Sequence, residues 1–315
     1  MSADHKGVGS DRHRGSDLYG RITQQIIEML GKGVVPWRSP ILARGKAGYP
    51  KNMNTGKPYR GVNVFLLAVT AHFMGYDSAY WLTFRQAQQR GGHVRKGERA
   101  TMVVFYKPIE VTDKGTGEVK KVPMLRHYLV FNANQCNGID VPDAMPYTPS
   151  AVKPLEAAKQ IVDGYREAPR IDHAGTRAFY VPAEDRVQVP EPQRFTSTEE
   201  YFGTLFHELG HSTGHSKRLD RGLDRDLRPF GSPDYSKEEL VAEMTAAFLC
   251  GEAQIEPVTI ANHASYVSGW LGALKGDAKL VVTAASAAQR ATEWILGTRP
   301  VEDADQSDSE PEPPA

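Results

Sequence analysis

The sequence is poor in three features, each of which would define a class of protein. It has 2 cysteines in 315 residues, Cys136 and Cys250, which form neither a disulfide framework nor a CxxC metal pair. It also lacks the run of roughly 18 apolar residues that could span a membrane, and its polar start lacks the apolar segment of a secretory signal. We therefore expect a soluble, cytoplasmic protein without a membrane partner, whose two thiols are buried and reduced.

The sequence also lacks a net charge, with 38 basic and 38 acidic side chains, but the two signs are unevenly distributed. Residues 17–150 carry 18 basic and 9 acidic side chains, whereas residues 151–300 carry 17 and 21. A basic first half indicates a polyanionic partner. Lysines and arginines that only keep a surface solvated are the alternative, and charge alone does not choose between the two.

Composition divides the chain into segments. Both ends contain few apolar residues and are predicted to be disordered. Four prolines between residues 142 and 154 interrupt the middle of the chain, and proline disfavours helix in the residue before it. The predicted organisation is a disordered arm (1–16), a first domain (17–145), a linker (146–155), a second domain (156–300) and a disordered acidic tail (301–315).

The first half is predicted to be α+β. Apolar residues at spacings of three and four predict helices over 17–30, 63–74 and 83–90. Two β-rich runs, 101–111 and 122–132, flank a short connection that contains glycine. This pattern is typical of an antiparallel hairpin.

Aromatic rings alternate with cations along the first half. Single-stranded nucleic acid offers phosphates to cations and unpaired bases for stacking, so this combination predicts binding without sequence specificity. Tyr49 and Tyr59 lie in polar sequence rich in glycine and proline and are expected at the surface, whereas Trp81 and Phe84 flank a predicted helix and are assigned to the core. The candidate nucleic-acid contacts are Trp37, Arg38, Lys51, Lys57, Tyr59, Arg60, Arg85, Arg95, Lys96 and Arg99.

The most specific motif is the HExxH element formed by His207, Glu208 and His211. Thr196 or Ser197 can cap the helix that carries it, and an apolar stripe follows. On a helix, the two histidines lie one turn apart on the same face, so both imidazoles can bind one metal ion. Glu208 can then act as the general base toward a water molecule at that ion.

A third metal ligand is expected from residues 236–243, which begin a second, acidic helix. Glu239 is the preferred ligand, with Glu243 accepting a hydrogen bond from a ligand histidine; the reverse assignment is the alternative. His215 is a rival, but Gly214 is expected to end the first helix before it. Zinc is the expected ion and manganese the alternative.

Two further elements are predicted around the motif. Segments 177–181 and 186–190 are predicted to be strands ahead of the metal helix, where an edge strand could hold an extended peptide. Tyr180 is a candidate transition-state donor, with core packing as its alternative role. The run 284–296 is predicted to be a packing helix. The second half is therefore predicted to be a metal-binding domain.

Over residues 17–300, the sequence resembles the ArdC antirestriction proteins of conjugative plasmids, and it is also similar to the N-terminal part of TraC-type plasmid primases. The resemblance implies an N-terminal α+β domain that binds single-stranded DNA, a C-terminal zincin-like metallopeptidase domain and protection of incoming plasmid DNA from host restriction. It is carried by residues 36–37, 59–63, 81–84, 94–98, 130–136, 204–215, 218–219 and 238–243.

Two functions stay open at this level. In the first, the protein binds single-stranded DNA and also uses its metal site as a hydrolase. In the second, it is a DNA-binding or partner-binding module whose metal site is structural, and a host protein such as a restriction enzyme is the candidate partner. Replacing Glu208 by glutamine, which keeps both histidines, separates the two functions.

Overall fold

The computed structural model of the protein describes residues 8–38, 49–112, 119–142, 154–225, 233–255 and 263–298. The helices are α1 (Val8–Gly31), α3 (Val62–Met74), α4 (Phe84–Gln89), α5 (Pro154–Gly164), α6 (Thr198–Ser212), α7 (Pro233–Ala253), α8 (His263–Gly276) and α9 (Leu280–Leu296). The strands are β1 (Lys51–Asn52), β2 (Tyr80–Thr83), β3 (His93–Val94), β4 (Thr101–Thr112), β5 (Val119–Asn132), β6 (Cys136–Asn137), β7 (Arg170–His173), β8 (Phe179–Val181) and β9 (Arg186–Val189). Short 3-10 turns are η1 (Pro36–Arg38), η2 (Ala133–Gln135), η3 (Pro182–Glu184) and η4 (Pro192–Arg194).

The first half is built on a four-stranded sheet in the order β1-β2-β5-β4. Strands β4 and β5 pair antiparallel from Thr101 opposite Val130 to Thr112 opposite Val119, which confirms the predicted hairpin. Its connection, residues 113–118, lies outside the described residues. Asn63 of α3 fixes the helix to this sheet: its Nδ2 donates to the Val104 carbonyl (2.6 Å), and its Oδ1 accepts from the Val104 amide (2.8 Å).

The three helices predicted in this half are present as α1, α3 and α4. Helix α1 begins at Val8, so residues 8–16 are helical, whereas the sequence interpretation treated them as a disordered arm. Once the packed stretch from Leu18 has nucleated the helix, each further residue adds a hydrogen bond, and no proline stops the helix from extending. Helix α4 starts with a capping box between Thr83 and Gln86.

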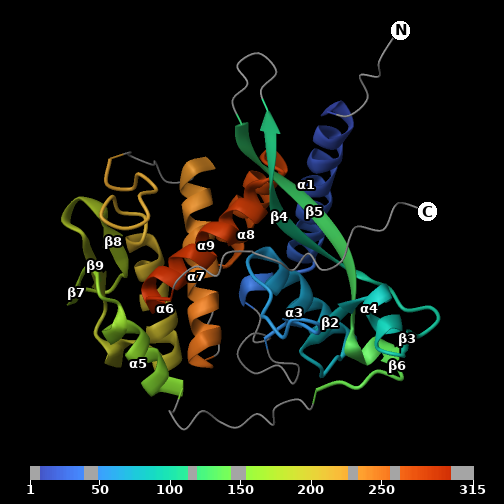
Figure 1. Cartoon of the computed structure of the whole chain (residues 1–315). Coiled ribbons are helices and arrows are strands. Elements are labelled where there is room, and N and C mark those ends of the chain that lie inside the picture. Colours follow the sequence, from blue (N-terminus) through green and yellow to red (C-terminus); the bar gives the residue numbers. More distant parts are fainter. Residues whose placement is uncertain are drawn as a thin grey trace.

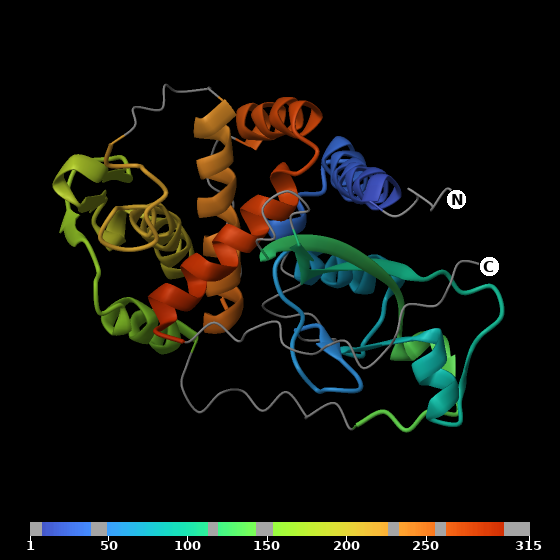
Figure 2. The ribbon, with the colours of Figure 1, turned by 45° about the horizontal axis from the view of Figure 1, so that its top comes forward.

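The second half contains a three-stranded sheet in the order β7-β9-β8. Strands β8 and β9 were predicted, and β7 was not. Helix α6 packs against this sheet through Phe202, Leu205 and Phe206. Figure 1 and Figure 2 both show α7 and α9 in the centre of the molecule, between this sheet and the sheet of the first half.

The two halves share one hydrophobic core. Trp37 of η1 packs edge-on against Trp270 of α8, with ring centroids 5.4 Å apart, and Phe65 of α3 stacks on Phe248 of α7 at 4.8 Å. Burying a large apolar side chain contributes roughly 1.5–3 kcal/mol, so these contacts join η1 and α3 of the first half to α8 and α7 of the second. The domain limits taken from the sequence stay a prediction, because each half has its own sheet and a smaller hydrophobic cluster of its own, whereas the main core contains residues of both halves.

Polar contacts reinforce this junction. Arg60 forms an ion pair with Glu293 of α9, and the Gly61 amide donates to Gln289 Oε1 at 3.2 Å. At the other end of α9, the Thr23 hydroxyl donates to the carbonyl of Ala278 at 2.7 Å. The loop at residues 60–61 is therefore attached to the second half.

Both cysteines are free thiols, with Cys250 buried and Cys136 half-buried. Burial raises the pKa of the Cys250 thiol to about 12, so this side chain stays in its neutral form. Within the described ranges, none of the helices has the length and apolar character required to cross a lipid bilayer.

Candidate metal centre

Helix α6 begins where the sequence predicts. Ser197 is its N-cap, and the Ser197 hydroxyl accepts a hydrogen bond from the Glu200 amide at 3.1 Å. The Glu200 carboxylate in turn accepts from the backbone amide of Thr196 at 2.7 Å. Leu205 and Leu209 are fully buried on one side of the helix. These contacts fix the helix so that its two motif histidines face α7.

A glycine allows α6 and α7 to approach closely. A Cβ atom at Gly210 would lie 3.1 Å from the Ala242 Cα and 3.2 Å from the Thr245 Cβ, which is tighter than normal packing. The glycine inside the HExxH motif therefore lets α7 lie directly across α6. This approach brings Glu239, one turn before Ala242, next to the histidines.

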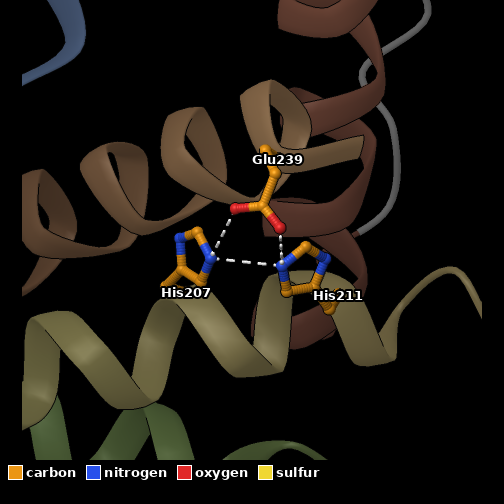
Figure 3. A group of neighbouring side chains, drawn as sticks. All are labelled: His207, His211 and Glu239. Atoms are coloured by element: carbon orange, nitrogen blue, oxygen red, sulfur yellow. Dashed lines mark hydrogen bonds and ion pairs between the residues drawn. The ribbon is translucent and has the colours of Figure 1, made fainter. Parts of the chain in front are cut away.

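His207, His211 and Glu239 form a compact cluster (Figure 3). The two Nε2 atoms are 3.1 Å apart, and each lies 3.5 Å from one oxygen of Glu239. Ligands bound at 2.0–2.2 Å around a tetrahedral zinc ion are about 3.3 Å apart, so these three atoms have the spacing that such an ion requires. The side chains are 9%, 14% and 8% exposed, so the cluster is largely shielded from water.

The outer nitrogen of each ring faces another carboxylate. His211 Nδ1 lies 3.6 Å from Glu238 Oε1, and His207 Nδ1 lies 3.9 Å from Glu243 Oε1. Glu243 therefore lies behind one ring, whereas Glu239 lies between the two rings. This geometry favours Glu239 over Glu243 as the third ligand. The sequence interpretation did not select Glu238.

Arg221 is a second residue that the sequence interpretation missed. It donates to both oxygens of Glu238, at 2.6 and 3.0 Å, and to the carbonyl of Gly210 at 3.0 Å. Burial alone would keep Glu238 neutral, but its contacts with His211 and Arg221 lower its pKa. Arg221 thus holds an ionised carboxylate against His211. Residues 221 and 238 meet only in the tertiary structure, so no local spacing reveals the pair.

The charges within the cluster shift the pKa values of its side chains. Burial disfavours the charged form of His207, but the carboxylate of Glu239 outweighs it and raises the pKa of His207 to about 9. Burial would raise the pKa of Glu239, but its contacts with His207 and His211 outweigh this effect and lower the pKa to about 2. His207 is therefore protonated at neutral pH, and a metal ion that binds to its ring would displace this proton.

Glu208 lies beside this cluster. Burial raises the pKa of Glu208, although the neighbouring histidines oppose the shift, and its carboxylate accepts a hydrogen bond from the backbone of Tyr180. A carboxylate with a raised pKa close to a metal site can accept a proton near neutral pH. Its position is therefore compatible with the predicted role of a general base.

The Tyr180 hydroxyl is not available as a transition-state donor, which corrects that suggestion. It donates to Asp185 Oδ1 at 2.9 Å and accepts from Arg218 Nη2 at 3.2 Å. Arg218, which is buried, also donates to Asp185 and to the carbonyl of Ser212. These contacts tie the turn between β8 and β9 to the segment after α6, so the role of Tyr180 is structural.

His215 is outside the cluster. Helix α6 ends at Ser212, before Gly214, as predicted. His215 Nδ1 accepts a hydrogen bond from the Lys217 amide at 3.1 Å, and its Nε2 lies 3.9 Å from Asp224. His215 therefore has partners of its own and is not the third ligand.

Among the predicted nucleic-acid contacts, the two aromatic residues are wrong. Trp37 and Tyr59 are each 1% exposed, so neither ring has a free face on which a base could stack. Both belong to segments that cross the shared core, where burying a large ring is more favourable than exposing it. Phe84 shows the opposite error, because it was assigned to the core and is 45% exposed.

The cationic candidates fall into three groups. Lys57, Arg85, Arg95, Lys96 and Arg99 are exposed, and Lys51 is half-buried. Arg60 is paired with Glu293 at the junction of the two halves. The side chain of Arg38 lies outside the described residues. The exposed cations leave a basic surface on the first half, although Arg95 shares its charge with Glu98 at 2.6 Å.

Comparison with known proteins also divides the chain into two parts. Residues 16–131 match the family described as the N-terminal domain of anti-restriction factor ArdC, and residues 156–287 match the zincin-like metallopeptidase family. The metal-free crystal structure of the antirestriction protein ArdC from plasmid R388 superimposes with a TM-score of 0.70 and 38% identity, over 90% of this chain and 99% of that one. The chain belongs to the ArdC family. The resemblance seen in the sequence and the predicted α+β, two-part fold class are confirmed.

Other relatives extend the family. The Mn(II)-bound structure of the R388 ArdC protein matches with a TM-score of 0.71 and 36% identity, over 89% of this chain and 97% of that one. The uncharacterized protein y4eC of Sinorhizobium fredii is 36% identical over 89% of this chain and 92% of its own length. A DNA primase TraC of Escherichia coli is 35% identical over 87% of this chain, which spans only 19% of the primase.

Proposed function

We propose that this protein binds single-stranded DNA through its first half, without sequence specificity, and protects incoming plasmid DNA from restriction in the recipient cell. The observation that carries the proposal is the match with the R388 antirestriction protein along nearly the whole length of both chains. The basic first half, with 18 basic and 9 acidic side chains in residues 17–150, supports the DNA-binding part.

Two measurements test this function. The first is the affinity of the full-length protein for a labelled oligonucleotide of mixed sequence, at several salt concentrations and with duplex competitor. Each phosphate contact should contribute about −0.7 to the slope of log K against log salt for a single strand. The second is the frequency of plasmid transfer, with and without this protein, into recipients with and without a restriction system.

The DNA-binding proposal fails if the protein does not bind the oligonucleotide at low salt. The antirestriction proposal fails if the protein does not change the frequency of transfer into restricting recipients.

We also propose that His207, His211 and Glu239 hold one divalent cation. Two imidazoles and one carboxylate are a common ligand set for zinc, so zinc is the first candidate. Manganese is the second, because it is the ion in one structure of the R388 protein. A bound cation would supply Lewis acidity. Glu238 and Arg221 would hold His211 in place, and Glu243 would do the same for His207.

A peptidase-like reaction would use Glu208 as the base. Its raised pKa and its position next to both histidines support this role. A structural role for the metal site is the second candidate, and a different observation favours it: Glu208 is buried and its carboxylate already accepts a hydrogen bond from Tyr180. In the structural case, the second half would dock a host protein such as a restriction enzyme.

Glu208→Gln separates these two roles, because it preserves the three proposed ligands. Metal content, measured by elemental analysis, should match that of the wild-type protein. If the site is a working hydrolase, the variant should lose antirestriction activity in the transfer assay while keeping its DNA affinity. Full antirestriction activity in this variant would exclude proteolysis from the mechanism.

A further inference from the structure

One face of β5 leaves apolar side chains in water. Side chains alternate between the two faces of a strand, so His127, Leu129 and Phe131 share one face. Leu129 is 52% exposed, His127 is exposed and Phe131 is half-buried. Phe84, the first residue of α4, continues the line, with its ring centroid 6.4 Å from that of Phe131 at an angle of 61°. We call these four residues the Phe84 row.

The opposite face of the same sheet is closed. Trp81, Val103 and Val130 point into the shared core and are at most 2% exposed. On the face of the Phe84 row, Leu82 opposite Phe131 and Val104 opposite His127 are also buried, so the exposure is confined to the row itself. Exposed apolar side chains that form a contiguous patch mark a binding surface, and here Phe84 contacts Phe131, which is two residues from Leu129 on the same face of β5. Figure 1 shows β5 running from α1 to the side of α4.

Cations flank both ends of the row. Arg85 follows Phe84 directly and is exposed. At the other end, partial loss of water around the ring and then the charge of Arg21 on α1 lower the pKa of His127, so the charge of this arginine acts on that end of the row. Along the strand, His127 and Phe131 are about 13 Å apart. The surface thus combines a flat apolar strip with positive charge at each end.

We infer that the Phe84 row is the stacking platform for the bases of single-stranded DNA. This inference rests on the proposed DNA-binding function and assigns it to a specific surface. Sheet surfaces with exposed aromatic rings stack two or three bases, and stacking tolerates any sequence because every base has a flat face. Phe84 and Phe131 would stack bases, Leu129 would pack between them, and Arg85 and Arg21 would contact phosphates.

The test uses the full-length protein and a mixed-sequence oligonucleotide. Phe84→Ala should weaken binding about 5- to 150-fold, which is the range expected for the loss of one stacked base. The slope of log K against log salt should stay the same, because no phosphate contact is removed. Phe73→Ala is the matched control: Phe73 is 62% exposed on α3, is in contact with His72 and is not part of the row. Its affinity should change less than about twofold.

A second variant distinguishes the loss of base stacking from a loss of folding. Phe84→Trp keeps a flat ring, so it should bind within a few-fold of the wild-type protein, and the fluorescence of the new tryptophan should be quenched when DNA stacks on it. Equal affinities of Phe84→Ala and Phe73→Ala, together with unquenched fluorescence, would overturn the platform while leaving the DNA-binding function intact. A wild-type protein that binds no DNA at low salt would overturn both proposals.

Discussion

The metal cluster and the Phe84 row differ in how far their side chains are exposed to water. In the cluster, His207, His211 and Glu239 are nearly buried, and each ring nitrogen lies 3.5–3.9 Å from a carboxylate oxygen. In the row, Phe84 and Leu129 are about half exposed. A small cation binds tightly only where ligands are already in place, whereas a flexible strand needs an accessible flat surface. Burial therefore marks the first kind of site and exposure marks the second.

The largest effect is expected from removing a ligand in the cluster. His211→Ala leaves one imidazole and one carboxylate, which are too few to hold a divalent ion. We expect stoichiometric metal to be lost and the metal-dependent rise in melting temperature to disappear. Elemental analysis and thermal unfolding with and without zinc measure both effects. DNA affinity should stay within a few-fold, and a parallel loss of DNA binding would show that the two sites are not independent.

The next effect concerns the support of the cluster. Arg221→Met removes both hydrogen bonds to Glu238 and frees this carboxylate to leave His211. Loss of such an outer partner lowers metal affinity by about 10- to 100-fold, which competition with a coloured chelator can measure. Arg225→Met is the control, because Arg225 pairs with Asp220 at the surface. Equal affinities of the two variants would mean that Arg221 does not position the ligand.

The affinity for metal should also depend on pH. Only the neutral form of His207 binds a cation, and its pKa in the metal-free protein is about 9. Below this pH, binding must release a proton, so affinity should fall by up to about tenfold for each unit of decrease. Glu239, with a pKa of about 2, stays ionised over this range. Titrations at constant ionic strength between pH 6 and 9 test the slope, and a flat profile would contradict the proton displacement.

The smallest effect is expected at the basic surface. Lys96 is exposed, so replacing it by glutamine should weaken single-strand binding only about two- to threefold. The informative quantity is the salt dependence, whose slope should become shallower by about 0.7 if Lys96 contacts a phosphate. Phe84→Ala should give the reverse pattern, with a larger loss of affinity and no change of slope. The two variants together separate phosphate contacts from stacking.

The local parts of this structure could be predicted from sequence. The spacing of His207 and His211 is a property of one helix, and the capping by Ser197 lies within a few residues of that helix. The pairing of β4 with β5 joins two consecutive strands, so it is equally local in sequence. Helix α8 was missed, because glycines at 269 and 272 interrupt its apolar pattern.

The sequence predictions failed at residues whose burial or partners depend on tertiary contacts. Tyr59 lies in polar, proline-containing sequence, but it is buried, because α3 and the sheet close over it. Phe84 follows a strand and begins a helix, and only the sheet geometry shows that it points to the open face. Arg221 and Glu238 are far apart in sequence and come together only when α6 and α7 pack.

Helix α7 supplies Glu239 to the cluster and, farther along, Phe248 to the aromatic stack with Phe65. This sharing has an evolutionary consequence. A chain that contained only one half would expose the apolar side chains of the shared core to water, so we expect relatives to contain both halves. The similarity with the E. coli TraC primase extends over 293 residues and 87% of this chain, so it includes both halves.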